Sequence, residues 1–568
     1  MHRQTPSRRR RIIRKPSSQA SDQQDGAEIP PQNLLKQGLV QIKAFAARFL
    51  PGLLFWTTDA PSDDENDRTA ERQPPDIPSH ALVKANTTLD QTRENSDVNT
   101  SATDSNMSSE ASKDLPKLSG TLEGPRTCGP SSEELTERQQ HDRDFAPFRA
   151  ISVDRFKAQL RKYLDPSGEV FTNPRMRVLR RTEGASHHVV ILQFGAPQYE
   201  LDYVFKLPVT GTKERWKEEH AYTMNCEAML IKHIKKHTDI PMPEIKQVDL
   251  GFENKLGAPY ILMNRVRGKS AGYIWYEKGD GYAMNADSPP EETMKKRETF
   301  LKSLAGHMAQ LRKLEFYKIG MPICDEGAPV VGHSWETVDG DRKMRPATGS
   351  TQNYLISGIE DRWPSDMTLE DIEGDDDEYK QKELDEMRGM RKIIDMIFRS
   401  PPFTDLEGGM ERYVIRHPDL DLQNIMTDKD GNVTGIIDWH EAVTAPRCVG
   451  YAGLPRFLVK DWLPDFTLED PPYMAWNLDH YRRMYANAMK ESCEDGKFTY
   501  KSTMYQAVYA AVTRGGSARD LVNKVLLQLP RLRLVDLDEF QERLGRGWLA
   551  AESYLEKEIR ELFDSTSA

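Results

Sequence analysis

Residues 416–426 read Arg-His-Pro-Asp-Leu-Asp-Leu-Gln-Asn-Ile-Met, and residues 435–439 read Gly-Ile-Ile-Asp-Trp. Apolar residues at 413–415 and 425–426 bracket a polar loop. The Asp-Lys-Asp-Gly-Asn sequence at 428–432 predicts a tight hairpin turn, after which residues 433–437 return as a strand that ends on Asp438. We therefore expect this hairpin to bring Asp419, Asn424 and Asp438 close together at one edge.

These three polar side chains fit the needs of phosphoryl transfer. One carboxylate must orient an attacking hydroxyl and accept its proton, while a carboxamide and a second carboxylate hold Mg²⁺ against the phosphates of ATP. Mg²⁺ prefers hard oxygen ligands in octahedral geometry, and Asn and Asp side chains supply them. The pattern thus predicts a site where the protein contributes positioning and charge neutralisation.

The composition excludes several other classes of protein. The chain has 568 residues, a formal net charge of −11 and 38% hydrophobic residues, so part of its length is expected to bury no core. No uncharged apolar run approaches the ~20 residues of a membrane-spanning helix. The five cysteines are widely separated, which argues against a disulfide scaffold or a zinc module. A mildly acidic chain has no electrostatic reason to bind nucleic acid.

Residues 1–143 differ from the rest of the chain. Residues 1–15 are rich in arginine and lack acidic residues, which is typical of a nuclear-import or anion-binding patch and equally of a solvated basic tail. Apolar residues at helical spacing predict an amphipathic helix at about 34–50. The segment 34–56, which contains this helix, would contact a membrane surface or a partner, or would pack on the protein itself. Residues 57–143 are polar and predict a disordered linker. We expect a cytoplasmic protein, with mitochondrial and nuclear locations as alternatives.

Ordered structure is expected to begin near Phe148. A short amphipathic helix at 153–163 precedes three strands at 176–179, 188–194 and 199–207, a helix at 213–236, and two more strands at 245–252 and 259–266. Beyond Gly268 the apolar spacing becomes helical. The acidic stretch at 361–387 is interpreted as a solvated surface insertion.

The polar residues also carry a resemblance to a known family. His-x-Asp-Leu-x-x-x-Asn at 417–424, followed by Ile-Asp-Trp at 437–439, resembles the catalytic signature of the aminoglycoside phosphotransferase family of kinase-like enzymes, and in particular its fungal branch, which includes altered-inheritance-of-mitochondria proteins. Lys206 in Tyr-Val-Phe-Lys-Leu-Pro resembles the family's third-strand lysine, and Glu227 resembles its partner on the following helix. Ile-Pro-Met-Pro at 240–243 and the hinge segment at 260–265 also match, so the resemblance spans about residues 150–560.

The resemblance implies a fold and a set of roles. The fold would be α+β and protein-kinase-like, with a small antiparallel sheet plus a helix in the N-lobe (144–268), a mainly helical C-lobe (269–568) and a disordered N-terminal tail. The implied catalytic residues are Asp419, as the base, and His417, and the implied Mg²⁺ ligands are Asn424 and Asp438. The implied ATP-binding residues are Lys206, Glu227, Gly184, Ser186, Met263 and Arg265.

Two departures from protein kinases shape the functional prediction. The nucleotide loop at 183–188 has one glycine in place of Gly-x-Gly-x-x-Gly, and at its end we expect a turn that exposes one ring of His187 and His188 and buries the other. Trp439 follows Asp438 and no protein-kinase activation segment is recognisable, which favours a small-molecule acceptor over a protein. We therefore expect an ATP/Mg²⁺-dependent kinase of a small-molecule hydroxyl. The alternatives are a nucleotide-binding pseudokinase and an adaptor that acts through its N-terminal tail.

Overall fold

A computed structural model describes residues 136–168, 174–196, 199–277, 288–325, 327–338, 341–404, 410–462, 477–513 and 518–564. All of them belong to one compact unit of the chain. The predicted helix at about 34–50 and nearly all of the predicted linker lie outside these residues. Among the described residues, no helix is both long enough and apolar enough to cross a bilayer.

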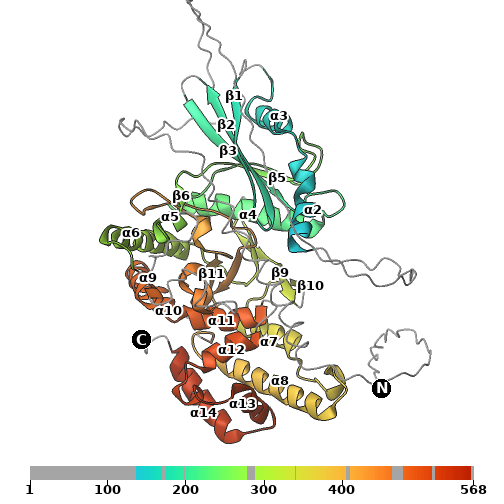
Figure 1. Ribbon diagram of the computed structural model, residues 1–568, viewed down its shortest axis with the longest axis vertical. Helices are drawn as coiled ribbons and strands as arrows, with labels where there is room; N and C mark the ends of the chain where they lie inside the picture. Colours follow the sequence, from blue (N-terminus) through green and yellow to red (C-terminus); the bar gives the residue numbers. More distant parts are fainter. Residues whose placement is uncertain are drawn as a thin grey trace, which may run out of the picture. The chain divides into compact units, whose positions relative to one another are not determined.

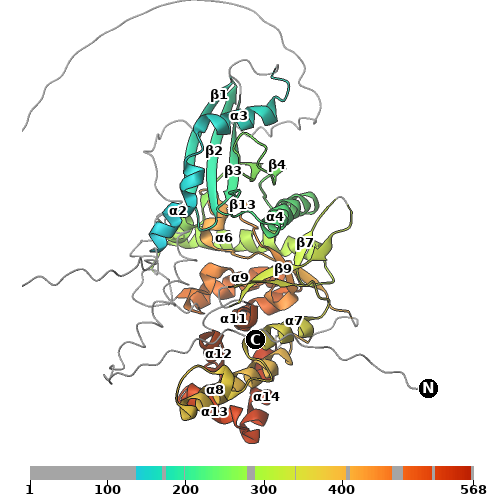
Figure 2. The same ribbon diagram turned by 90° about the vertical axis from the view of Figure 1, so that its right-hand side faces the viewer.

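The first lobe is built on a five-stranded antiparallel sheet with the order β1-β2-β3-β5-β4. Strands β1, β2, β3 and β5 are labelled in Figure 1, and β4 is labelled in Figure 2. Its strands are β1 (Arg175–Glu183), β2 (His187–Ala196), β3 (Tyr199–Pro208), β4 (Ile245–Asp249) and β5 (Tyr260–Asn264). All five strands were predicted from the sequence. The sheet is covered on one face by α2 (Glu137–Arg149) and α3 (Val153–Leu164), and α4 (Glu218–His237) lies on the other side (Figure 2).

The alternation of side chains along β3 decides which residues face which helix. Phe205 and Leu207 are fully buried in a cluster with Phe148 of α2 and Phe156 of α3. Because successive side chains of a strand point to opposite faces, Lys206 between them is directed to the face covered by α4. The apolar packing of β3 therefore places a lysine where the helix glutamate can reach it.

The predicted start of order near Phe148, and with it the boundary at residue 144, was wrong. Helix α2 begins at Glu137 with Thr136 as its N-cap, and the cap and Gln139 form a reciprocal capping box. Only Phe145 and Phe148 of this helix are buried apolar residues. The helix is polar elsewhere, and composition alone assigned its first half to the linker.

The second lobe is mainly helical, which confirms the predicted α+β class. Its helices are α5 (Gly272–Trp275), α6 (Glu291–Met308), α7 (Thr351–Arg362), α8 (Asp377–Phe398), α9 (Leu478–Ser492), α10 (Gly496–Thr499), α11 (Ser502–Thr513), α12 (Ala518–Leu526), α13 (Leu537–Gly545) and α14 (Leu549–Phe563). Short 3₁₀ turns lie at Ala309–Lys313, Leu369–Asp371, Leu422–Asn424, Arg447–Val449, Arg456–Leu458, Lys460–Trp462 and Pro530–Leu532.

Small strands complete this lobe and hold the polar loop of residues 417–424. They are β6 (Lys269–Ser270), β7 (Met321–Ile323), β8 (Val330–Gly332), β9 (Ser334–Val338), β10 (Asp341–Arg345), β11 (Tyr413–Arg416), β12 (Ile425–Thr427), β13 (Val433–Ile436) and β14 (Val443–Pro446). The predicted hairpin is confirmed, because β12 pairs with β13 and Ile425 lies opposite Ile436. Strand β11 enters the loop and is paired with β14.

The interpretation of 361–387 as a solvated insertion was wrong for its last part. Helix α8 begins at Asp377 and buries Asp385 and Glu386. Arg546 pairs with Asp385 at 3.0 Å, and Arg519 pairs with Glu386 at 2.7 Å. Acidic residues are buried here because arginines from α12 and from the end of α13 neutralise them.

Candidate active site

Lys206 joins two carboxylates that lie far apart in the sequence. Its Nζ donates to Oε1 of Glu227 at 2.6 Å and to Oδ1 of Asp438 at 2.7 Å, and the lysine is only 8% exposed. Burial alone would lower the pKa of Lys206, but Asp438 and Glu227 raise it overall, so the amine stays charged. Burial likewise opposes ionisation of Glu227, and Lys206 holds the pKa of that carboxyl below its usual value.

Asp438 follows directly on the hairpin. It has a backbone φ of 65°, in the left-handed region that Asp tolerates better than most residues. The turn after Ile437 directs the carboxylate toward Lys206. Although burial opposes ionisation, Lys206 lowers the pKa of Asp438, so the group is an anion.

His417 is held by the backbone on both sides of its ring. Its Nε2 lies 3.1 Å from the carbonyl oxygen of Ile437, and its Nδ1 accepts the N–H of Asp419 at 3.1 Å. These partners require the proton on Nε2 of a neutral imidazole. Burial lowers the pKa of His417 to about 4, and the ring packs edge-on against buried Trp439. His417 therefore positions the loop, and it has no ring nitrogen free for proton transfer.

Asp419 is oriented by the residue predicted to bind metal. Asn424 Nδ2 donates to the backbone oxygen of Asp419 at 2.8 Å and to its Oδ2 at 3.1 Å. Gln423 also donates to Oδ2, and Arg456 lies 3.3 Å from Oδ1. Burial raises the pKa of Asp419, and Arg456 opposes that rise. The carboxylate is a basic group held by three donors, and 37% of its side chain remains exposed.

Ile437 connects the two halves of this arrangement. Its carbonyl oxygen is the partner of His417, and its N–H donates to the carbonyl oxygen of Asn424 at 2.9 Å. Lys206, Glu227 and Asp438 are thereby joined through one residue to the loop that carries Asp419. The structure thus brings together six predicted site residues, which are Lys206, Glu227, His417, Asp419, Asn424 and Asp438.

The sequence did not reveal the cations that support this loop. Asp421 is buried, and Lys460 binds it at 2.8 Å. Arg456, which contacts Asp419, also donates its backbone N–H to Leu420. Arg456 and Lys460 lie more than thirty residues after the catalytic loop and belong to no recognisable motif. The one signal in the sequence was Asp421, the second aspartate of the loop, because a buried carboxylate needs a partner.

The loop between β1 and β2 was predicted incorrectly at its histidines. His187 and His188 are both buried, with 8% and 2% exposure. Nδ1 of His188 lies 2.9 Å from Oε1 of Glu183, and Glu183 also binds Arg149 of α2. His187 is on the opposite face of β2, where its ring packs edge-on against the ring of His440 with 4.8 Å between the ring centroids. Both rings are buried because both faces of β2 are covered. Gly184 donates its N–H to the carbonyl oxygen of His187, and Ser186 is exposed.

The predicted hinge residues lie at the end of β5. Met263 is buried and stands opposite Val204 of β3. Arg265 is exposed, and both its backbone N–H and its guanidinium bind Asp202. The N–H of Arg265 therefore continues the sheet, and it cannot at the same time donate to a bound base.

The first lobe carries a lysine–glutamate pair under an antiparallel sheet. This pair faces a helical lobe that carries the Asp…Asn loop and a second Asp. Together these features define a protein-kinase-like phosphotransferase fold. The chain belongs to the phosphotransferase enzyme family, whose sequence model matches residues 177–485. This match includes every side chain described above as a candidate site residue. The search of curated proteins finds no match.

Solved structures of such enzymes also resemble the chain. A thermostable mutant of aminoglycoside phosphotransferase APH(4)-Ia in a ternary complex with AMP-PNP and hygromycin B has 13% identity and a TM-score of 0.34, covering 72% of this chain and 99% of its own. Ethanolamine kinase from Plasmodium vivax has 10% identity and a TM-score of 0.30, with 73% and 98% coverage. A macrolide 2′-phosphotransferase of type I has 13% identity and a TM-score of 0.29, with 66% and 97% coverage.

Proposed function

We propose that the protein transfers the γ-phosphoryl group of ATP to a hydroxyl of a small-molecule acceptor, with Mg²⁺ as the metal. The observation that carries this proposal is the joint placement of Lys206, Glu227 and Asp438 with Asp419 and Asn424. The family match on residues 177–485 supports the class of reaction.

In this proposal Lys206 binds the phosphates. Its amine is charged, and Glu227 fixes it from the helix side at 2.6 Å. A phosphate oxygen that approaches from the site would exchange with Asp438 as the lysine's second partner. Lys206 would then neutralise part of the charge that develops during transfer.

Asp438 and Asn424 fit the ligand needs of Mg²⁺. Both offer oxygen atoms, and both hydrogen bonds that Asn424 makes to Asp419 use its Nδ2. Its Oδ1 would therefore be the atom that binds the cation, together with the ionised carboxylate of Asp438. When bound, Mg²⁺ would supply charge neutralisation between the β- and γ-phosphates.

Asp419 is the group that would accept the proton. The acceptor hydroxyl oxygen forms a bond to the γ-phosphorus, the bond from that phosphorus to the β,γ-bridging oxygen breaks, and the hydroxyl proton moves to Asp419. ADP leaves with the bridging oxygen. Arg456 opposes the rise that burial causes in the pKa of Asp419, and Gln423 and Asn424 orient the carboxylate. His417 holds the loop in place.

The remaining predicted nucleotide contacts stay proposals. Ser186 and the backbone around Gly184 would close over the phosphates, and Met263 would line the adenine site. Because the N–H of Arg265 donates to Asp202, adenine would be read by other backbone groups of the hinge segment. We propose that residues 144–268 form a nucleotide lobe, to which the whole of α2 also belongs, and that residues 269–568 form an acceptor lobe.

The acceptor can be found without knowing its class. The purified full chain is incubated with ATP, Mg²⁺ and a cell metabolite extract, and phosphorylated species are compared by mass spectrometry with those formed by Asp419→Asn. We expect one class of hydroxyl compound to gain phosphate only with the wild-type protein. If no species differs between the two proteins, the proposal of a small-molecule acceptor fails.

A further inference from the structure

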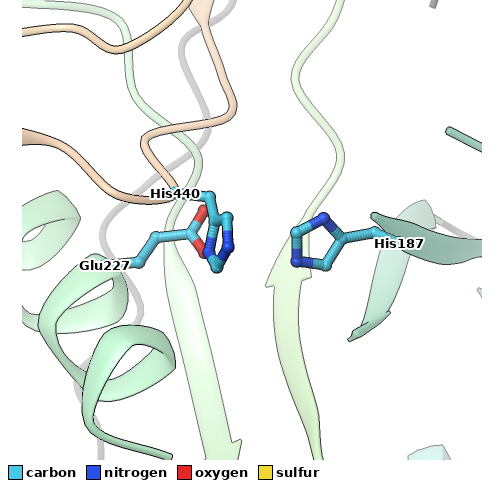
Figure 3. Close-up of side chains that lie close together, drawn as sticks. All are labelled: His187, Glu227 and His440. Atoms are coloured by element: carbon cyan, nitrogen blue, oxygen red, sulfur yellow. The ribbon is translucent and has the colours of Figure 1, made fainter. Parts of the chain in front are cut away.

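Three side chains with metal-binding atoms converge beside Lys206. His187 comes from the first residue of β2, Glu227 from the middle of α4, and His440 from the segment that follows Asp438. One donor atom from each lies within 4.8 Å of the others. Figure 3 shows the ring of His187 pointing from its strand toward the other two groups, with the Glu227 carboxylate and the His440 ring beside each other.

Glu227 has an oxygen that the nucleotide site does not use. Its Oε1 binds Lys206, but its Oε2 is buried and has no hydrogen-bond partner among the described residues. Nδ1 of His440 lies 3.6 Å from this oxygen, beyond hydrogen-bond distance, and is itself buried without a hydrogen-bond partner among the described residues. Glu227 is 2% exposed. An unsatisfied buried carboxylate oxygen costs about 1–3 kcal/mol or more, so a missing partner is expected at this position.

We propose that His187, Glu227 and His440 bind one transition-metal ion of the Zn²⁺ class. Two imidazoles and one carboxylate form a ligand set that suits Zn²⁺ and related ions, whereas Mg²⁺ and Ca²⁺ prefer oxygen ligands. This site is therefore chemically distinct from the Mg²⁺ site proposed at Asn424 and Asp438.

The distances fit such an ion after small side-chain movements. Bonds of about 2.0–2.2 Å in tetrahedral geometry place donor atoms roughly 3.3 Å apart, compared with the separation of up to 4.8 Å found here. Oε2 of Glu227 and Nδ1 of His440 are already 3.6 Å apart. The main movement required is an approach of the His187 ring.

Bound metal would connect three separate parts of the fold. It would fix the end of the loop between β1 and β2 to α4 and to the segment after β13. Glu227 can serve Lys206 and the ion together, because each uses a different carboxylate oxygen. We therefore expect the ion to stabilise the folded chain without breaking the Lys206–Glu227 pair.

Direct metal binding tests this proposal in the absence of nucleotide, so its failure is separate from failure of the proposed kinase activity. The full chain is stripped with EDTA and titrated with Zn²⁺ by calorimetry and with Co²⁺ by visible absorption. His187→Ala and His440→Ala are compared with the wild type. The control is His237→Ala, since His233 and His237 lie on α4 with ring centroids 4.2 Å apart and form a competing surface pair.

We expect one Zn²⁺ per chain at this site, a tetrahedral Co²⁺ spectrum and a higher melting temperature with Zn²⁺. His187→Ala and His440→Ala should each weaken binding at least tenfold and abolish the spectrum, and His237→Ala should retain both. Unchanged binding in His440→Ala, or loss of binding in His237→Ala, would overturn the proposal. His440 is partly exposed, so His440→Ala decides the question if His187→Ala does not fold.

Discussion

Lys206 and Asp438 form an ion pair of 2.7 Å although 232 residues separate them in the chain. The lysine belongs to the sheet of the first lobe, and the aspartate follows the β12–β13 hairpin of the second. Because Glu227 binds the same amine, one cation balances two carboxylates. The pair thus connects the two lobes at the point where the phosphates are proposed to bind.

Replacement of Lys206 should destabilise the protein as well as weaken its binding of nucleotide. Lys206→Met leaves the buried carboxylate of Glu227 without its cation, and removal of one partner of a buried pair costs about 3–5 kcal/mol. We expect a loss of about 3 kcal/mol in urea unfolding, because Asp438 is partly exposed. Lys295→Met is the matched control, since Lys295 and Glu291 form an exposed pair worth ~0.5 kcal/mol or less. Equal unfolding midpoints for the two variants would contradict this account of Lys206.

Helices α8 and α13 approach each other closely at two glycines. A Cβ on Gly389 would overlap the carbonyl oxygen of Gln541, and one on Gly545 would overlap the carbonyl oxygen of Asp385. Gly389→Ala should therefore push the helices apart and lower the free energy of unfolding by about 2 kcal/mol or more.

The control for this prediction is Gly306→Ala in the exposed part of α6, where an added Cβ meets nothing within 4 Å. Alanine favours the helix there by up to about 1 kcal/mol. Thermal unfolding should show a lower melting temperature for Gly389→Ala and an unchanged or higher one for Gly306→Ala. A tolerated Gly389→Ala would show that the two helices can separate without cost.

Acid should destabilise the protein through His417. The folded pKa of about 4 is below the ordinary value near 6.5, so the unfolded chain binds the proton more readily. The stabilisation from neutral His417 is complete above pH 6.5 and is lost as the pH falls toward 4. At pH 5 the expected loss is about 2 kcal/mol relative to pH 7.5.

His417→Gln isolates this contribution, because the other titrating groups are the same in both proteins. Urea unfolding at pH 7.5 and pH 5 should show a drop for the wild type that exceeds the drop for the variant by about 2 kcal/mol. Identical drops would mean that His417 is not the neutral, backbone-bound ring described here.

The parts of the fold that were predictable are those with local signals. The β12–β13 hairpin follows from the Asp-Lys-Asp-Gly-Asn turn, and Lys206 follows from the alternation of β3. Helix α2 was missed because its surface is polar and only two of its apolar residues, Phe145 and Phe148, are buried. The boundary at 144 relied on composition, which does not record a capping box.

The missed parts of the site depend on contacts between distant residues. Nothing in the sequence near Arg456 or Lys460 indicates that they neutralise Asp419 and Asp421. The burial of both His187 and His188 required knowledge of what covers each face of β2. The pairing of Arg265 with Asp202 likewise depends on the register between β3 and β5.

The most direct test of the central claim separates phosphoryl transfer from nucleotide binding at Asp419. Single-turnover transfer to the acceptor and the Kd for ATP with Mg²⁺ are measured for the full wild-type chain and for Asp419→Asn. Loss of a general base typically slows transfer by about 10²–10⁴-fold, and Asp419 makes no contact with Lys206, so we expect that loss with a Kd changed by less than about threefold. Transfer by Asp419→Asn at the wild-type rate would contradict the account.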